Sequence, residues 1–302
     1  MIPVLLVIAI TAYLIGNRGS SANPPVASSA VSGKETRIAA GSGVLLEYPA
    51  GWQTAGPAPT IPGLTVAHPL LLAPGGNSTH AGLLSGQLPA GQPSPLPASF
   101  LALLHAVPLA EVVSLENLQA YRYSNITGYQ RALDIYVIPD AGGSWTALIC
   151  YAASGYAGYL QQCEQIVAKV TRVSQTSDDV SPNAAYASQL SELIAGLEWE
   201  RSRLRAQMPK QPTMLASLAT MLAKRFAGTA VSVTALEPPV PASPAQAVLA
   251  SALLRARAAY TALATAADEA RALGGAEARV NETEAGVDAA LENFALLGYT
   301  NS

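Results

Sequence analysis

Histidine is scarce in this chain, and the shortage limits the metal chemistry open to it. The three histidines, His68, His80 and His105, are separated by 12 and 25 residues. Metal sites built on histidine usually place two ligands close together in sequence, as in H-E-x-x-H. No histidine follows residue 105, so the C-terminal part lacks the Glu-x-x-His ligands of di-iron helical bundles. We therefore expect no metal.

Charged residues are also few, at 12% of the 302 residues, and the net charge is only −3. No stretch concentrates lysine and arginine, so we expect no nucleic-acid partner. The serine hydrolase motifs G-x-S-x-G and S-x-x-K do not occur, and neither does a glycine-rich loop that would hold a nucleotide phosphate. The sequence predicts a protein that is not an enzyme and uses no cofactor.

Charge is absent altogether from residues 2–16, IPVLLVIAITAYLIG. This apolar run is long enough to span a thin bilayer, and we expect a transmembrane anchor at 1–18, followed by a flexible linker at 19–36. A cleaved signal peptide or a buried core helix is an alternative. The anchor interpretation is favoured because no basic residue precedes the run and no A-x-A-like site follows it directly. It predicts a single-pass membrane protein with the bulk of the chain outside the cytoplasm.

Residues 37–175 show short β-rich runs separated by Gly and Pro, which is typical of an α+β domain with an antiparallel sheet and covering helices. Helical spacing appears at 98–105 and 157–172. Strands are expected at 43–48, 64–73, 80–88, 112–123, 130–138 and 145–153.

Residues 176–302 carry apolar side chains at helical spacing, in four stripes separated by Pro-rich or Gly-rich segments. The pattern predicts an all-α antiparallel four-helix bundle. Glu200 and Glu284 fall at seam positions. This leaves open an alternative in which two helical hairpins complete their core only against a partner.

The only two cysteines are predicted to form a disulfide. Alternation along strand 145–153 places Cys150 on the same face as Leu148 and Ala152, and Cys163 falls on the apolar stripe of the next helix. Both thiols can therefore meet between sheet and helix. Such a bond would add about 3 kcal/mol of stability. Two buried free thiols are the alternative.

Tyrosine outnumbers phenylalanine by 12 to 3, and aromatic side chains with a polar end suit binding surfaces. Tyr121, Tyr123, Tyr136 and Trp145 are the candidate binding surface, although a half-buried sheet face would also explain them.

Asp134 interrupts an apolar strand. We interpret it as a cross-strand partner of Arg122 or Arg131 rather than a general base.

Several segments resemble the PsbP-like family, in the LpqN-type form found in exported and membrane-anchored proteins of high-GC Gram-positive bacteria. The likeness is carried by VLLEYPAGWQ at 44–53, AYRY at 120–123, ALDIYVIP at 132–139, and SWTALICYA followed by a helix with Cys163. It covers residues 37–173. The resemblance implies an α/β/α sandwich that serves for docking rather than catalysis. The helical part lies outside it.

These observations together predict a membrane-anchored cell-envelope protein that docks a protein or a cell-wall component. Two other functions stay open. A carrier of lipid or another hydrophobic ligand would need an apolar cavity. An enzyme would need His68, His80 or His105 near Asp134 or Glu111, because acid–base groups must reach one substrate.

Overall fold

The computed structural model describes residues 35–126, 131–140, 143–173, 180–206 and 211–299. The segment Lys34–Ser302 forms one compact unit. The predicted anchor at 1–18, nearly all of the predicted linker and the predicted boundary after residue 175 lie outside the described residues.

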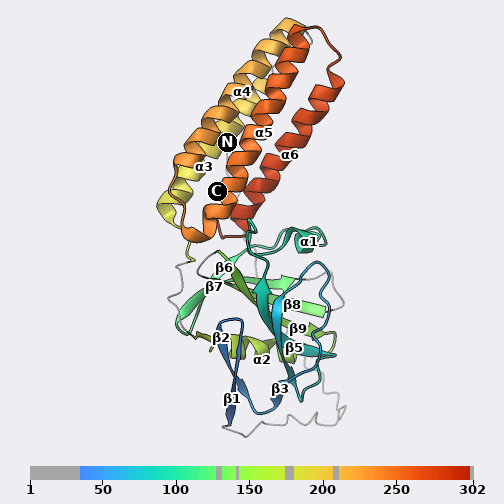
Figure 1. The fold of residues 1–302 in the computed structure, drawn as a ribbon, viewed down its shortest axis with the longest axis vertical. Helices are drawn as coiled ribbons and strands as arrows, with labels where there is room; N and C mark the ends of the chain where they lie inside the picture. Colours follow the sequence, from blue (N-terminus) through green and yellow to red (C-terminus); the bar gives the residue numbers. More distant parts are fainter. Residues whose placement is uncertain (1–34, 127–130, 141–142, 174–179, 207–210, 300–302) are drawn as a thin grey trace, which may run out of the picture. The chain divides into compact units, whose positions relative to one another are not determined.

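The N-terminal region of this unit is an α+β structure with two antiparallel sheets, as Figure 1 shows. The larger sheet has seven strands in the order β3-β4-β5-β9-β8-β7-β6, and the smaller one has the order β1-β2-β10. The strands of the larger sheet are β3 (Trp52–Thr54), β4 (Ala67–Pro74), β5 (Ala81–Leu88), β6 (Glu111–Leu115), β7 (Leu118–Ile126), β8 (Arg131–Pro139) and β9 (Trp145–Ala153). Those of the smaller sheet are β1 (Thr36–Gly41), β2 (Val44–Pro49) and β10 (Thr171–Arg172).

Three of the predicted elements differ from the structure. The strand expected at 112–123 is a hairpin, because Glu116 and Asn117 form a two-residue turn between the paired residues Leu115 and Leu118. The helix expected at 157–172 is shorter. It comprises α2 (Gly158–Val167), after which β10 pairs with β2. Helix α1 is also brief, spanning Ala98–Leu101.

The larger sheet has a hydrophobic core on each face. Along β9 the side chains alternate, so that Leu148 and Cys150 join the core under α2 and the smaller sheet. Ile149 and Tyr151 join the other core, which also includes Phe100 of α1. Because both faces are covered, β8 and β9 are almost continuously buried.

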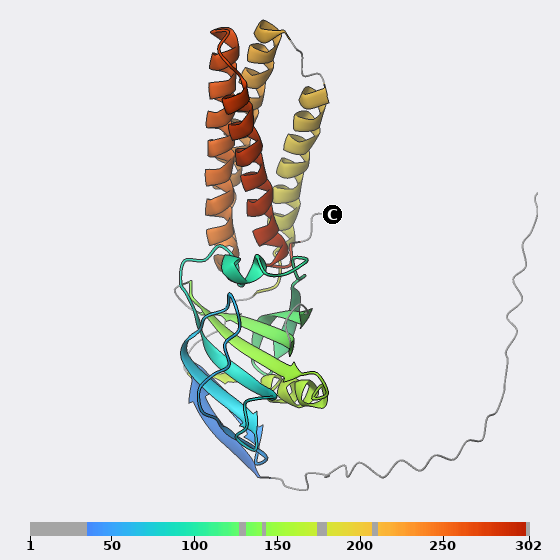
Figure 2. The same cartoon turned by 90° about the vertical axis from the view of Figure 1, so that its right-hand side faces the viewer.

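The C-terminal region consists of four helices that run alternately in opposite directions (Figure 2). They are α3 (Ala184–Ala206), α4 (Pro212–Ala235), α5 (Ser243–Asp268, preceded by the 3₁₀ turn η1 at Val240–Ala242) and α6 (Gly274–Ala295). The Pro-rich segments predicted to separate the helices include Pro212 and Pro244. These two prolines lie instead in the first turns of α4 and α5, where a missing backbone N–H costs nothing.

Helix α5 is the most buried of the four. Leu249, Leu253 and Tyr260 are fully covered by neighbouring helices, and the Tyr260 ring stacks on Phe226 of α4 with centroids 5.5 Å apart. Val240–Asp268 is also, within the described part of the chain, the one helix long and apolar enough to cross a membrane. The core helix of a bundle meets the same criterion.

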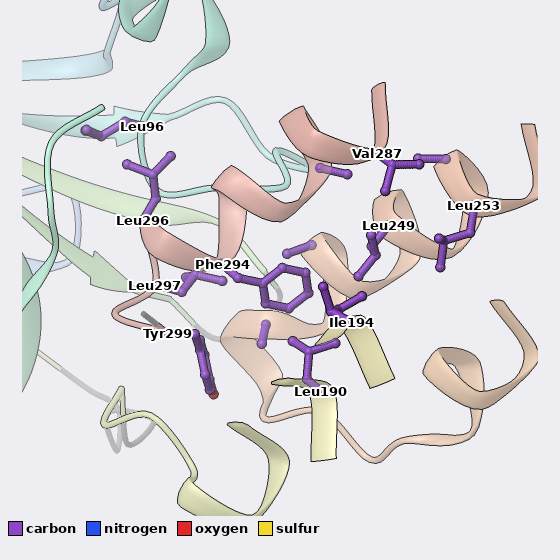
Figure 3. Close-up of a cluster of buried hydrophobic side chains, with 14 of the residues drawn as sticks. Leu96, Leu190, Ile194, Leu249, Leu253, Val287, Phe294, Leu296, Leu297 and Tyr299 are labelled. Carbon is purple, nitrogen blue, oxygen red and sulfur yellow. The ribbon is translucent and has the colours of Figure 1, made fainter. Parts of the chain in front are cut away.

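The sheet and the helices share one hydrophobic core. Leu96, beyond β5, lies near Leu296 and Leu297, which follow α6, and Phe294 and Tyr299 continue the cluster toward α3 (Figure 3). Two hydrogen bonds link the same regions: the Tyr123 hydroxyl donates to the Leu296 carbonyl, and the Val180 N–H donates to Gln119. The C-terminal end of α6 is therefore attached directly to β7.

Candidate functional site

The four aromatic residues of the predicted binding surface are buried. Tyr121, Tyr123, Tyr136 and Trp145 expose only 1, 0, 5 and 3% of their surface. The reason is that both faces of the larger sheet are covered, whereas the prediction assumed a face open to solvent. The prediction that these four residues form a binding surface is therefore wrong.

Each of these tyrosines has an internal role. Tyr121 packs against Trp145 with ring centroids 6.1 Å apart. Burial raises the pKa of Tyr123 well above its ordinary value, and its hydroxyl is committed to the carbonyl of Leu296. On the opposite face, burial raises the pKa of Tyr136 to about 12, although the nearby Arg122 lowers it. Tyr123 and Tyr136 therefore both stay neutral near pH 7.

The predicted pairing of Cys150 and Cys163 is present, with Cα atoms 5.8 Å apart. Cys150 lies on β9 and Cys163 on α2, and both side chains are buried. The bond closes the turn that joins β9 to α2. This turn therefore has a covalent link across its base.

Three aromatic residues gather beside that turn, and we call them the aromatic row: His80 and Tyr156, which are exposed, and Tyr159, which is half-buried. The rings of His80 and Tyr156 are stacked with centroids 4.4 Å apart and an angle of 2° between their planes. Tyr159 extends the row, with its centroid 6.3 Å from that of Tyr156. Tyr156 is 38% exposed. His80 and Tyr156 therefore present aromatic rings to solvent.

Backbone contacts hold the row in place. The Ala153 N–H donates to the His80 carbonyl, and the Tyr156 N–H donates to the Ala153 carbonyl. Gly155 between them has φ of +86°, a conformation that glycine adopts at little cost.

The two residues before His80 are also anchored. The Tyr151 hydroxyl donates to the Ser78 carbonyl, and Arg131 donates to the Thr79 carbonyl while stacking on the Tyr151 ring. These contacts hold the strand side of the row.

A second polar feature lies on the sheet face that α2 covers. Arg122 of β7 forms ion pairs with Glu164 of α2, with Asp134 of β8 at 3.6 Å and with Glu111 of β6 at 3.9 Å. Asp134 also accepts a hydrogen bond from the Asn125 N–H. Arg122 is thus the cross-strand partner expected for Asp134, whereas Arg131 is engaged at the aromatic row.

Burial raises the pKa of Glu164, and a hydrogen bond with Asp134 raises it further, against the opposing effect of Arg122. The ion pair between Arg122 and Glu164 attaches α2 to the sheet. His68 and His105 are exposed, and among the described residues neither forms a hydrogen bond or ion pair with Asp134 or Glu111. Within the same residues, no three His, Cys, Asp or Glu side chains are placed to hold a metal ion.

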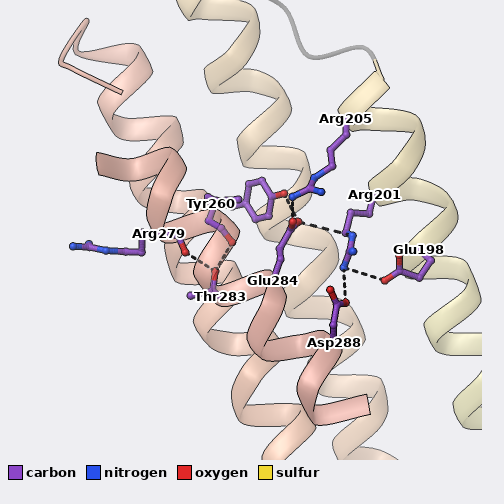
Figure 4. Close-up of polar contacts among 9 residues, drawn as sticks. Glu198, Arg201, Arg205, Tyr260, Arg279, Thr283, Glu284 and Asp288 are labelled. Carbon is purple, nitrogen blue, oxygen red and sulfur yellow. Dashed lines mark hydrogen bonds and ion pairs between the residues drawn. The ribbon is translucent and has the colours of Figure 1, made fainter. Parts of the chain in front are cut away.

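The helical region has its own polar cluster, centred on Glu284 of α6, which is only 3% exposed. Arg201 and Arg205 of α3 both reach this carboxylate, and Tyr260 of α5 donates to it (Figure 4). Glu200, the other acidic seam residue, pairs with Arg225 of α4. Both carboxylates therefore find partners inside the same chain.

The sequence did not reveal the aromatic row, because His80 is 76 residues from Tyr156 and only the pairing of β5 with β9 brings them together. A partial signal was present in Tyr156 and Tyr159, three residues apart in a Gly-rich turn before a helix. Comparison of the chain with protein-family models and with curated proteins found no match.

Proposed function

We propose that this chain is a non-enzymatic docking protein of the cell envelope, which binds a glycan of the cell wall through the aromatic row. The row supports the proposal because it presents aromatic groups to solvent on a rigid base. Aromatic rings stack on the apolar faces of sugar rings, and their polar groups hydrogen-bond to hydroxyls.

The supporting surface is fixed before a ligand arrives. The disulfide, the backbone hydrogen bonds at Ala153 and the contacts of Arg131 and Tyr151 hold the residues that carry the row. A rigid surface loses little conformational entropy on binding. The rigidity of the row therefore favours a docking function. The Arg122 cluster contains arginine and carboxylates but no histidine that could take part in acid–base catalysis.

The same proposal includes location. The apolar run at 2–16 would anchor the chain in a membrane, and the rest would lie on the side where disulfides form. The Cys150–Cys163 bond is consistent with that placement, as is the PsbP-like resemblance of residues 37–173.

The proposal is tested by co-sedimentation of the full chain, kept in a mild detergent, with insoluble cell-wall polysaccharide. Tyr156→Ala removes the central ring, and His80→Ala removes its stacked neighbour. Each should weaken binding about three- to tenfold, the equivalent of one ring contact of about 0.5–1.5 kcal/mol.

Trp199→Ala is the matched control, because Trp199 of α3 is an exposed aromatic residue, 62% accessible, outside the row. Its removal should leave sedimentation unchanged. Equal binding by the parent, Tyr156→Ala and His80→Ala would refute the role of the row.

A further inference from the structure

The four helices divide into two oppositely charged pairs. Helix α4 contains no acidic residue, and α4 and α5 together carry four basic side chains and one carboxylate: Lys224, Arg225, Arg255, Arg257 and Asp268. Helices α3 and α6 together carry eight carboxylates and four arginines. The bundle therefore has one basic and one acidic helix pair.

These pairs lie on opposite sides of the bundle. Helix α3 contacts α4 through Glu200 and Arg225, and contacts α6 through Arg205 and Glu284. Helix α5 lies between α4 and α6. Going around the bundle, the α4/α5 side is thus opposite the α6/α3 side (Figures 1 and 2).

Each side has a surface groove. The first, which we call the basic groove, has a volume of about 310 Å³ and lies between α4 and α5. Its lining includes the basic residues Lys224 and Arg257, together with alanine and threonine side chains. Within the described residues neither Lys224 nor Arg257 forms an ion pair, so both positive charges are available.

The second groove, the acidic groove, has a volume of about 340 Å³ and lies between α3 and α6. Ile194, Leu291 and Ala295 line its apolar part, and the carboxylates at its rim are Glu198, Asp288 and Glu292. Arg201 pairs with Glu198 and Asp288. Glu292 has no ion pair within the described residues, so the rim retains negative charge.

We propose that the basic groove of one copy docks on the acidic groove of a second copy. The two surfaces match in kind: each is a shallow groove between antiparallel helices with apolar side chains between charges of one sign. Helices pack by placing the ridges of one into the grooves of another, and the paired charges would fix which surfaces meet. Because the two grooves differ and lie on opposite sides, the contact is head-to-tail and can continue beyond two copies.

Sedimentation velocity of the full chain in a non-ionic detergent, over a range of protein concentrations, tests this association. Species larger than one chain should increase with concentration at low salt. They should decrease at high salt, because exposed charges are screened beyond about 3 Å at 1 M ionic strength. A chain that stays single at every concentration would overturn the proposal, even if it binds vesicles of anionic lipid through Lys224 and Arg257.

Charge reversal identifies the surfaces. Lys224→Glu with Arg257→Glu, and separately Asp288→Lys with Glu292→Lys, should each weaken self-association by at least about tenfold, since like charges would then face each other. An equimolar mixture of the two variants should restore association, because each supplies the groove that the other lacks. Failure of the mixture, with both variants melting like the parent, would contradict the head-to-tail contact.

A matched control separates this effect from net charge. Arg255→Glu with Arg279→Glu changes the charge by the same amount outside both grooves and should leave association unchanged; an equal loss would refute the assignment. Should either reversal fail to fold, Lys224→Gln with Arg257→Gln is the milder variant and must still weaken association.

Discussion

In the α+β region one arginine, Arg122, lies among three carboxylates, whereas in the helical region one carboxylate, Glu284, lies between two arginines and a tyrosine. The two clusters have a similar task, because each attaches a helix: α2 to the sheet, and α3 to α6. The clusters differ in whether a covalent bond also holds the attached helix. Helix α2 is also held by a disulfide, but among the described residues no covalent link holds α3.

The two clusters also differ in how deeply their carboxylates are buried. Glu284 is almost fully buried, whereas in the Arg122 cluster only Asp134 is buried, and Glu164 and Glu111 remain 33% and 63% exposed. Removing one partner from a buried pair leaves an uncompensated charge, which costs far more than losing an exposed pair. The helical cluster should therefore be the more sensitive of the two.

The largest effect is expected from Glu284→Gln. Arg201 and Arg205 would lose their shared anion, and the free energy of unfolding should fall by about 3 to 5 kcal/mol. Urea denaturation of the full chain measures the change. The control Glu282→Gln changes an exposed residue of the same helix and should cost less than about 0.5 kcal/mol. Equal effects from the two variants would show that the Glu284 cluster does not hold α3.

Next in size is the loss of the disulfide. Replacing Cys150 and Cys163 by serine removes a bond that spans 13 positions, and should lower the free energy of unfolding by about 3 kcal/mol. A reductant should destabilise the parent and leave the double variant unaffected. If the reductant has no effect on the parent, the bond does not contribute as described.

A smaller effect concerns pH. Because the pKa of Glu164 is raised above its ordinary value of 4.5, the folded state binds this proton more tightly than the unfolded state does. The resulting stabilisation is present below about pH 4.5 and is lost as the pH rises through the folded-state pKa. Glu164→Gln should therefore gain stability relative to the parent as pH increases. Parallel pH profiles for the two chains would contradict the raised pKa of Glu164.

The smallest effect is expected at Lys169, which pairs with Glu47 at 3.5 Å while both side chains are about half exposed. Lys169→Ala should change the free energy of unfolding by less than about 1 kcal/mol, and added salt should abolish the difference. A larger change would mean that surface pairs matter as much here as buried ones.

Much of the local structure could be predicted from the sequence. Strand alternation and helical spacing placed Cys150 and Cys163 on facing surfaces, and β9 matches the predicted strand 145–153. The four apolar stripes correspond to the four C-terminal helices. In each case the pattern spans consecutive residues, so local physics was sufficient.

The tertiary arrangement could not be predicted from these local sequence patterns. The polar-ended aromatic character of Tyr121 and Tyr123 predicted a binding surface, but the sequence could not show that both faces of the sheet are covered. The aromatic row depends on strand pairing between distant segments. Nor could helical spacing show that Glu200 and Glu284 meet Arg225, Arg201 and Arg205 of neighbouring helices.

Anchoring outside the cytoplasm is the claim on which the proposed function rests, and one fractionation tests it most directly. Bacterial membranes containing the full chain are washed with alkaline carbonate, and the unfolded protein is then treated with an alkylating agent with and without a reductant. The account predicts that the chain stays with the membrane and that Cys150 and Cys163 react only after reduction. Release of the chain by carbonate, with both thiols reactive before reduction, would contradict it.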